Sequence, residues 1–239
     1  MPSTEAVRRQ YLDAMGVALW ERRAPLSAVV VDARVAEHPE ATAPVVIAPP
    51  AGASPEWMIL ETAVRGCTKC PLHATRTQTV FGTGNRRAQW MFVGEAPGAD
   101  EDRQGEPFVG AAGKLLNAMI AALGLKREDV YIANVLKCRP PNNRDPQPGE
   151  VEQCEAHLIG QIELIQPKLI VALGRHAAHS FLKTDLALAR LRGQHHHYRN
   201  IPLVVTYHPA YLLRTPSDKR KAWEDLCRAR AIAQEATTA

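Results

Sequence analysis

Long apolar runs are the first feature that this 239-residue sequence lacks. No run approaches the roughly 20 apolar residues that a membrane-spanning helix needs. The N-terminus also lacks an apolar segment followed by a small-residue cleavage site, which would mark a secreted protein. Cysteine is scarce too, and five cysteines argue against a disulfide scaffold and for a metal-binding or catalytic role. We therefore expect a cytoplasmic protein with a packed core.

Two common phosphate-binding motifs are absent as well. Gly113 and Lys114 resemble the end of a P-loop, but no Ser or Thr follows them, and position 108 holds Phe108 instead of a glycine. Gly110 and Gly113 supply only part of a dinucleotide-binding fingerprint. The formal net charge of +4 permits a polyanionic partner, and a mildly basic soluble protein explains that charge equally well.

From residue 56 onward, short apolar runs alternate with amphipathic patterns. Strands are predicted at residues 90–94, 130–135, 169–173 and 203–206, and helices at residues 57–65, 113–123, 150–166, 175–182 and 217–234. Such alternation is typical of βαβ units and of a parallel sheet that is covered on both faces. The prediction is an α/β fold with three layers, α/β/α, around a central, mainly parallel four-stranded sheet.

The N-terminal part has a different pattern. Residues 4–23 carry apolar side chains at helical spacing, which predicts a short amphipathic helix that docks on the core. Residues 36–55 are rich in Ala and Pro, as is typical of a flexible linker. We therefore divide the chain into an N-terminal extension, residues 1–55, and a second domain, residues 56–239.

Three polar stretches follow predicted strands, where open α/β sheets place their ligand sites. The first, residues 94–98, reads GEAPG and continues through Glu101 and Phe108 into the helix near Gly113. Its glycines allow backbone amides to approach a ligand closely, and the helix N-terminus favours negative charge. This loop is therefore a candidate ligand site.

The second stretch begins at Asn134, which ends a predicted strand. An amide side chain donates and accepts hydrogen bonds at once, which suits reading the edge of a base. The plain alternative is an Asn that caps a turn. Lys137, Arg139 and Arg144 follow and are candidates for holding backbone phosphates.

The third stretch follows the fourth predicted strand and contains His208, Leu212, Leu213 and Arg214. A His at the carboxyl end of a strand is well placed to meet a ligand, although a lone His is more often structural. Adjacent leucines in a loop either pack on the core or act as a wedge that enters a DNA stack. The histidine run at residues 195–197 cannot direct all three rings to one ion, so we expect it to be exposed in a loop.

Four of the five cysteines form a spaced set. Cys67 and Cys70 form a CxxC pair, and Cys138 and Cys154 lie far downstream, in a predicted loop and helix. Zinc is one candidate, although structural zinc sites usually pair two short knuckles. Cys227 stands alone, and we expect an inert thiol there.

Taken together, these residues resemble family 4 uracil-DNA glycosylases. The GEAPG…ED…G.PFVG, NVLKCRPPNNR and YHPAYLLR stretches match the three motifs of that family in order, and the cysteine spacing is similar to its [4Fe-4S] ligand pattern. The resemblance covers residue 57 to the C-terminal helix. It implies a uracil-DNA glycosylase-like catalytic domain at residues 56–239, a [4Fe-4S] cluster on Cys67, Cys70, Cys138 and Cys154, and uracil-containing DNA as the partner. We expect a monomer.

The resemblance also implies roles in base recognition. The uracil must be flipped into a pocket, where Phe108 would stack on it and Asn134 would pair with its N3–H and O4. His208 would donate to O2 as the base leaves. Leu212 or Leu213 would fill the gap left in the stack, with Lys137, Arg139, Arg144 and Arg214 on the DNA backbone.

The resemblance does not single out one residue that activates the attacking water. Ala96 stands where the best-known uracil glycosylases carry an Asp, which resembles family 4 and removes the obvious general base. Glu95, Glu101 and Asn143 occupy positions that match the family, and any of them could orient the water. The resemblance therefore implies pocket roles for Glu95, Ala96 and Asn143 and a further candidate in Glu101.

Two alternative functions are weighed against base-excision repair by a monofunctional glycosylase. A suicide-type relative traps the sugar covalently with a histidine in a basic insertion, but residues 140–146 read PPNNRDP, with neither feature. A non-enzymatic iron–sulfur module that binds nucleic acid would not need Phe108, Asn134 and His208 together. A family 5 relative is disfavoured because Glu95 and Gly98 follow the family 4 form of the first motif.

Overall fold

The computed structural model describes residues 54–238. The predicted helix at residues 4–23 and the linker up to residue 53 lie outside the described residues, so the division of the chain near residue 55 stays a prediction. No helix in the described part is long and apolar enough to span a bilayer.

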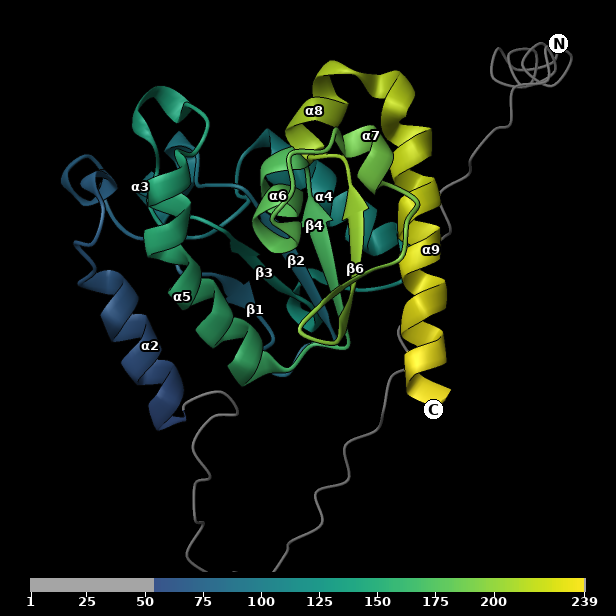
Figure 1. The fold of residues 1–239 in the computed structure, drawn as a ribbon, viewed down its shortest axis with the longest axis horizontal. Coiled ribbons are helices and arrows are strands. Elements are labelled where there is room, and N and C mark those ends of the chain that lie inside the picture. The colour runs from purple at the N-terminus through teal and green to yellow at the C-terminus, as the bar shows by residue number, and fades with distance from the viewer. Residues whose placement is uncertain (1–53, 239) are drawn as a thin grey trace, which may run out of the picture. The chain divides into compact units, whose positions relative to one another are not determined.

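Six strands form one sheet in the order β1-β3-β2-β4-β6-β5 (Figure 1). The four inner strands are parallel: β2 (Trp90–Gly94), β3 (Tyr131–Asn134), β4 (Leu169–Leu173) and β6 (Ile201–Thr206). They coincide with the four predicted strands to within two residues, so the predicted parallel core is confirmed.

Two short antiparallel edge strands complete the sheet, and the predicted number of strands was therefore too low. β1 (Thr83–Gly84) pairs with β3, and β5 (His196–Tyr198) pairs with β6. Strands of two or three partly exposed residues give no periodic apolar signal. The histidine run thus enters a strand and not a loop, while His195 and His197 are exposed as expected.

Helices fill the connections between the strands. They are α2 (Pro55–Arg65), α3 (Ala99–Gln104), α4 (Ala111–Ala122), α5 (Pro148–Ile165), α6 (Arg175–Leu182), α7 (Leu188–Leu191), α8 (Pro209–Arg214) and α9 (Lys219–Thr238), with 3₁₀ turns at Pro71–Ala74, Arg127–Asp129, Pro141–Asn143 and Pro216–Asp218. The five longest helices, α2, α4, α5, α6 and α9, agree with the predicted bounds to within four residues, and the bounds of α6 agree fully. The helices α3, α7 and α8 have six residues or fewer, too few to show helical periodicity.

Both faces of the sheet are buried, because successive side chains of a strand point to opposite faces. In β2, Met91 and Val93 face a core shared with α5, α6 and Trp57, whereas Trp90 and Phe92 face a second core shared with α4 and α9. Figure 1 shows α5 and α9 on opposite sides of the sheet. This is the predicted α/β/α arrangement.

The four parallel strands end at one edge of the sheet. Gly94 at the end of β2 is in register with Asn134 of β3, and Leu173 of β4 is in register with Thr206 of β6. In the sheet, β3 pairs with one side of β2 and β4 pairs with the other. The connections that leave β2 and β4 therefore diverge, which is where open α/β sheets bind ligands.

Candidate active site

A cavity of about 430 Å³ opens at this edge of the sheet. Its lining includes all the residues predicted to act in catalysis or base recognition: Glu95, Ala96, Glu101, Phe108, Asn134, Asn143 and His208. Arg144 and Arg214 line it as well. The fold thus gathers residues from all three predicted stretches around one cavity.

Asn134 presents an unpartnered acceptor in this cavity. The residue is only 2% exposed, and its Oδ1 has no hydrogen-bond partner within the described structure. An unsatisfied buried polar atom costs about 1–3 kcal/mol. A Cβ at Gly94 would lie 2.4 Å from Asn134 Oδ1 and 2.6 Å from Phe108 Cζ, so glycine keeps the space that both side chains use. The free acceptor indicates a polar ligand.

Phe108 holds a backbone conformation that bulky residues avoid, with φ at +55°. A Cβ at Gly113 would lie 1.7 Å from Phe108 O, so this turn requires glycine at position 113. The ring centroids of Phe108 and His208 lie 5.6 Å apart with an interplanar angle of 31°. The turn therefore holds an aromatic ring against the cavity, where a flat ligand can stack on it.

His208 precedes α8, and a local hydrogen bond fixes its tautomer. Nδ1 accepts from the Ala210 N–H at 3.1 Å, which places the proton of the neutral ring on Nε2. Burial, helped by the charge of Arg214, lowers the pKa of His208 to about 4. At neutral pH the side chain is therefore an uncharged Nε2–H donor.

An ion pair supports the strand end that carries His208. Arg192 Nε and Nη2 donate to the Asp225 carboxylate at 2.6 and 3.1 Å, and Thr206 Oγ1 donates to the same carboxylate at 2.8 Å. The Arg192 guanidinium also lies 4.4 Å from the centroid of the Tyr207 ring. This support was not predicted, because Arg192 and Asp225 lie in no recognisable motif.

Glu101 lines the cavity, but backbone amides occupy its carboxylate. Oε2 accepts from the Gly98 N–H at 3.1 Å, and Oε1 accepts from the N–H groups of Val109 and Gly110 at 3.0 and 3.2 Å. Glu101 thereby joins the segment before α3 to the segment before α4, both in the connection from β2 to α4. These bonds favour a positioning role over the predicted catalytic one.

The rim of the cavity carries part of the predicted basic set. Arg139 Nε donates to Asn143 Oδ1 at 2.8 Å, and Asn143 is exposed. Arg144 donates to both oxygens of the buried Glu150 carboxylate, at 2.9 and 2.5 Å. The charge of Arg144 is thus largely compensated within the protein. Arg214, by contrast, is exposed at the end of α8.

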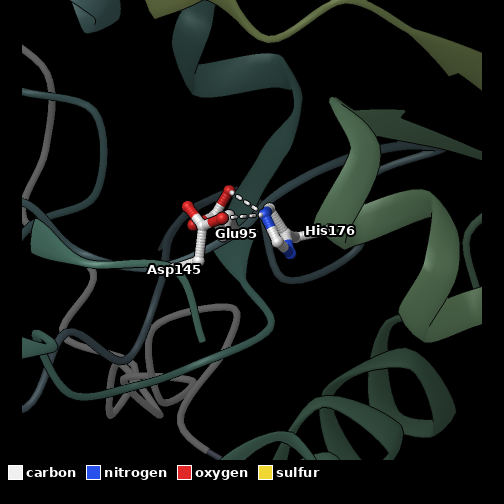
Figure 2. A group of neighbouring side chains, drawn as sticks. All are labelled: Glu95, Asp145 and His176. Atoms are coloured by element: carbon white, nitrogen blue, oxygen red, sulfur yellow. Dashed lines mark ion pairs between the residues drawn. The ribbon is translucent and has the colours of Figure 1, made fainter. Parts of the chain in front are cut away.

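Glu95 lies in a group of ionisable side chains that no sequence motif indicated (Figure 2). Its Oε2 lies 3.8 Å from His176 Nε2, which in turn lies 3.3 Å from Asp145 Oδ2. Burial and the nearby Asp145 charge raise the pKa of Glu95 to about 7, against the opposing charge of Arg175. The carboxyl group therefore exchanges its proton near neutral pH.

The four spaced cysteines lie together in a separate pocket. Cys67, Cys70, Cys138 and Cys154 line it with Arg76 and His157. Arg76 Nη1 donates to Cys138 Sγ at 3.1 Å and to Cys67 O at 2.9 Å. Distant parts of the chain thus converge on one thiol-lined site, as predicted from the spacing.

Residues 81–227 match the model of the Uracil DNA glycosylase superfamily. The chain is 52% identical to a type-4 uracil-DNA glycosylase of Archaeoglobus fulgidus over 64% of its own length and 81% of that protein. The chain belongs to the type-4 uracil-DNA glycosylases. A type-4 uracil-DNA glycosylase of Thermotoga maritima is 45% identical over 73% of this chain and 93% of its own length. A type-5 uracil-DNA glycosylase of Pyrobaculum aerophilum is 33% identical over 54% and 64%.

Two residues that the glycosylase motifs suggested for DNA contact are buried. Lys137 is 1% exposed, and its Nζ donates to Asn134 O at 2.8 Å and to Gln161 Oε1 at 2.6 Å. Leu212 is 1% exposed and packs in the core, whereas Leu213 is 43% exposed. The DNA-contact prediction was therefore wrong for Lys137 and Leu212, and Leu213 is the remaining wedge candidate.

The cysteine set of this type-4 glycosylase is too widely spaced for zinc. A tetrahedral zinc with Zn–S bonds of about 2.3 Å holds its sulfurs roughly 3.8 Å apart. Within residues 54–238, the one group of three potential ligand side chains whose atoms all lie within 4.8 Å is Glu95, Asp145 and His176, and it contains no cysteine. The thiol donors therefore fit a larger cluster better than a single ion.

Proposed function

We propose that this chain removes uracil from DNA by hydrolysing the N-glycosidic bond, as a monofunctional glycosylase of base-excision repair. The observation that carries the proposal is the unpartnered, buried Oδ1 of Asn134 beside the ring of Phe108 and the neutral donor of His208. Family membership supports the same reaction class.

Base recognition follows from these three side chains. A uracil flipped into the cavity stacks on Phe108 and offers its N3–H to Asn134 Oδ1, while the Asn134 amide N–H donates to O4. Cytosine carries an acceptor at N3 and a donor at the 4-position, so both contacts become repulsive. A buried amide left unpaired in this way rejects the wrong base strongly.

Leaving-group stabilisation is assigned to His208. As the bond between C1′ and N1 breaks, its electron pair moves to the base, and negative charge develops at O2. At neutral pH the His208 ring is uncharged, and the hydrogen bond from the Ala210 N–H to Nδ1 keeps the ring proton on Nε2. The Nε2–H group therefore donates to O2 directly. A preorganised donor of this kind contributes about 3 kcal/mol to transition-state stabilisation.

We assign contacts with the DNA strand to Arg139, Arg144 and Arg214, and filling of the vacated stack to Leu213. Leu213 and Arg214 are exposed on α8, next to the cavity that contains His208. Cytoplasmic location and a monomeric state stay predictions from the sequence.

The four cysteines are assigned as ligands of a [4Fe-4S] cluster. When bound, such a cluster would cross-link the segment between α2 and the turn at Pro71–Ala74, the loop after β3 and helix α5, and the hydrolysis would not need it. Arg76 and Lys137 bring positive charge to the thiolates, which favours an anionic cluster.

Loss of one cluster ligand is predicted to lower stability. Metal sites of this kind contribute several kcal/mol to folding, and each kcal/mol corresponds to about 2–4 °C in a domain of this size. Cys138→Ser should therefore lower the melting temperature by about 10 °C and reduce the iron content. Cys227→Ser is the matched control, because Cys227 lies on α9 outside the set. Equal iron content and melting temperature in both variants would contradict the ligand assignment.

Gly94→Ala is predicted to disable the cavity while the fold persists. The added methyl group would lie in the space of Asn134 Oδ1 and the Phe108 ring, so both side chains must move from the base-binding position. Displacement of about 1 Å from productive geometry costs about 100-fold in rate. Single-turnover excision measures this loss, and Gly149→Ala, where an added Cβ meets no atom within 4 Å, is the control.

The proposed function is tested with a labelled oligonucleotide that carries one uracil, run on a denaturing gel with and without alkali. Alkali-dependent cleavage at the uracil is the expected result. A slow band that survives denaturation would indicate covalent capture, as in the suicide-type relative. An unchanged substrate from protein that retains its iron would favour a binding module.

A further inference from the structure

Three polar residues surround Glu95 without a role in base recognition. They are Asp145, in the segment before α5, and Arg175 and His176, the first residues of α6. Figure 2 shows that the His176 ring points toward both carboxylates. Because Glu95 follows β2 and His176 follows β4, the group bridges the two connections that diverge at the edge of the sheet.

The contacts within this group form a chain of charges. Arg175 Nη2 lies 3.1 Å from Asp145 Oδ2 and 3.0 Å from His176 Nε2. His176 Nε2 lies 3.3 Å from Asp145 Oδ2 and 3.8 Å from Glu95 Oε2. His176 Nε2 thus takes part in three of these four contacts. It accepts from Arg175 when the ring is neutral, and it donates toward the carboxylates when the ring is protonated.

Two carboxylates and an imidazole are also potential ligands for a divalent cation. Here the guanidinium of Arg175 already contacts Asp145 Oδ2 and His176 Nε2, two of the atoms that a cation would use as ligands. A cation would have to displace it. The arrangement therefore favours control of proton position over metal binding.

We propose that Asp145, Arg175 and His176 are positioning residues that set the charge state of Glu95, so that its carboxylate takes the proton of the attacking water. This proposal rests on the proposed glycosylase function. In the step, the water oxygen bonds to C1′, and the bond between C1′ and N1 breaks with its electron pair leaving on uracil. One water proton passes to Glu95 and the hydroxyl group stays on C1′. Glu95 then returns the proton to solvent by way of His176.

The charges that face Glu95 come from several elements. Asp145 raises its pKa and Arg175 lowers it, with burial as the largest cause of the value near 7. Burial lowers the pKa of His176, so this ring is neutral at neutral pH. The same cavity is also lined by Glu101 of α3, Arg144, His208 and Arg214 of α8. Glu101 is bonded to backbone amides, Arg144 is paired with Glu150, and His208 is neutral. The charges that act on the pKa of Glu95 are those of Asp145 and Arg175, in opposite directions, and Arg214 is not among them.

The test compares Asp145→Asn with Arg175→Gln. Asp145→Asn removes a repulsive charge, so the pKa of Glu95 falls and the acidic limb of the rate profile moves to lower pH. Arg175→Gln removes an attractive charge, and the limb moves to higher pH. Since Asp145 and Arg175 are 69% and 55% exposed, solvent screening limits each shift. We expect about 0.5 pH unit, or roughly a threefold change at pH 6, in opposite directions.

Single-turnover excision from pH 5 to 9 gives the rate profile, and ¹³C titration of labelled Glu carboxyl groups, assigned with Glu95→Gln, gives the Glu95 pKa without substrate. Asp129→Asn and Arg190→Gln make the same charge changes at exposed positions outside the lining of the cavity and serve as controls. Salt near 1 M should shrink both shifts, because the Debye length falls to about 3 Å.

Shifts of equal sign, or none beyond those of the controls, would overturn the proposal even if the wild-type protein excises uracil. If the wild-type protein excised no uracil, the glycosylase function would fail, and the proton-accepting step of the proposal would be overturned with it. The carboxyl titration would then still decide whether Asp145 and Arg175 set the charge of Glu95.

Discussion

Replacing Asn134 by alanine should lower the single-turnover rate of uracil excision by about 10³-fold, while the melting temperature stays the same or rises. The side chain would make two hydrogen bonds to the base, and loss of such contacts in a closed site is costly. Its Oδ1 has no partner in the free protein, so its removal takes away an unsatisfied buried acceptor. Loss of activity without loss of stability separates a recognition role from a structural one.

Asn117→Ala is the matched control for this prediction. Asn117 is exposed on α4, and its Oδ1 accepts from Arg127 Nη1 at 2.9 Å. Its replacement should leave excision unchanged. A loss of less than tenfold in Asn134→Ala, or a fall of several degrees in its melting temperature, would contradict base reading by Asn134.

Replacing His208 by alanine should lower the excision rate by about 10²- to 10³-fold, which is the effect of removing one preorganised donor to a developing anion. His208→Gln should recover part of the loss because its amide keeps an N–H donor. The exposed His195→Ala should be neutral. Equal losses in the alanine and glutamine variants would argue that the imidazole acts by some means other than donation.

The low pKa of His208 also has a consequence for stability. The unfolded residue binds a proton near pH 6.5, whereas the folded one does so only near pH 4. The unfolded state therefore holds more protons between these values, and the free energy of unfolding falls as pH falls through this window. His208→Ala should flatten this part of the stability curve, as measured by denaturant unfolding at several pH values.

The inner strands were predictable because they are buried on both faces. The apolar runs at β2 and β4 were assigned with the observed bounds, since a strand with a core on each side contains no polar alternation. The edge strands β1 and β5 were missed. Two or three residues carry too little pattern, and tertiary pairing with β3 and β6 decides their conformation.

The residues that line the cavity were predictable as neighbours because each follows a predicted strand or lies in a motif. Lys137 was misassigned because a basic residue in a loop is normally solvated, and only the fold shows that Asn134 O and Gln161 accept its protons. The choice between Leu212 and Leu213 needed the helix α8, in which adjacent side chains point in different directions.

The group around Glu95 had no signal in the sequence. Asp145 lies in the connection after β3 and His176 in the connection after β4, both far from Glu95 along the chain. The parallel pairing of β2 with both of these strands brings the three residues together. Glu101 differs, because a Glu three residues after Gly98 is a recognisable capping pattern that predicts a bond to the Gly98 N–H. That signal was present and was outweighed by the expectation of catalysis.

The most direct measurement is the number of free uracil molecules released per protein molecule, counted by mass spectrometry with uracil-containing DNA in large excess. Hydrolysis in the cavity of Asn134 and His208 predicts many uracils per protein, with the protein mass unchanged. At most one uracil per protein, with DNA attached to the protein, would show covalent capture. No uracil at all from protein with a full complement of iron would contradict the glycosylase function.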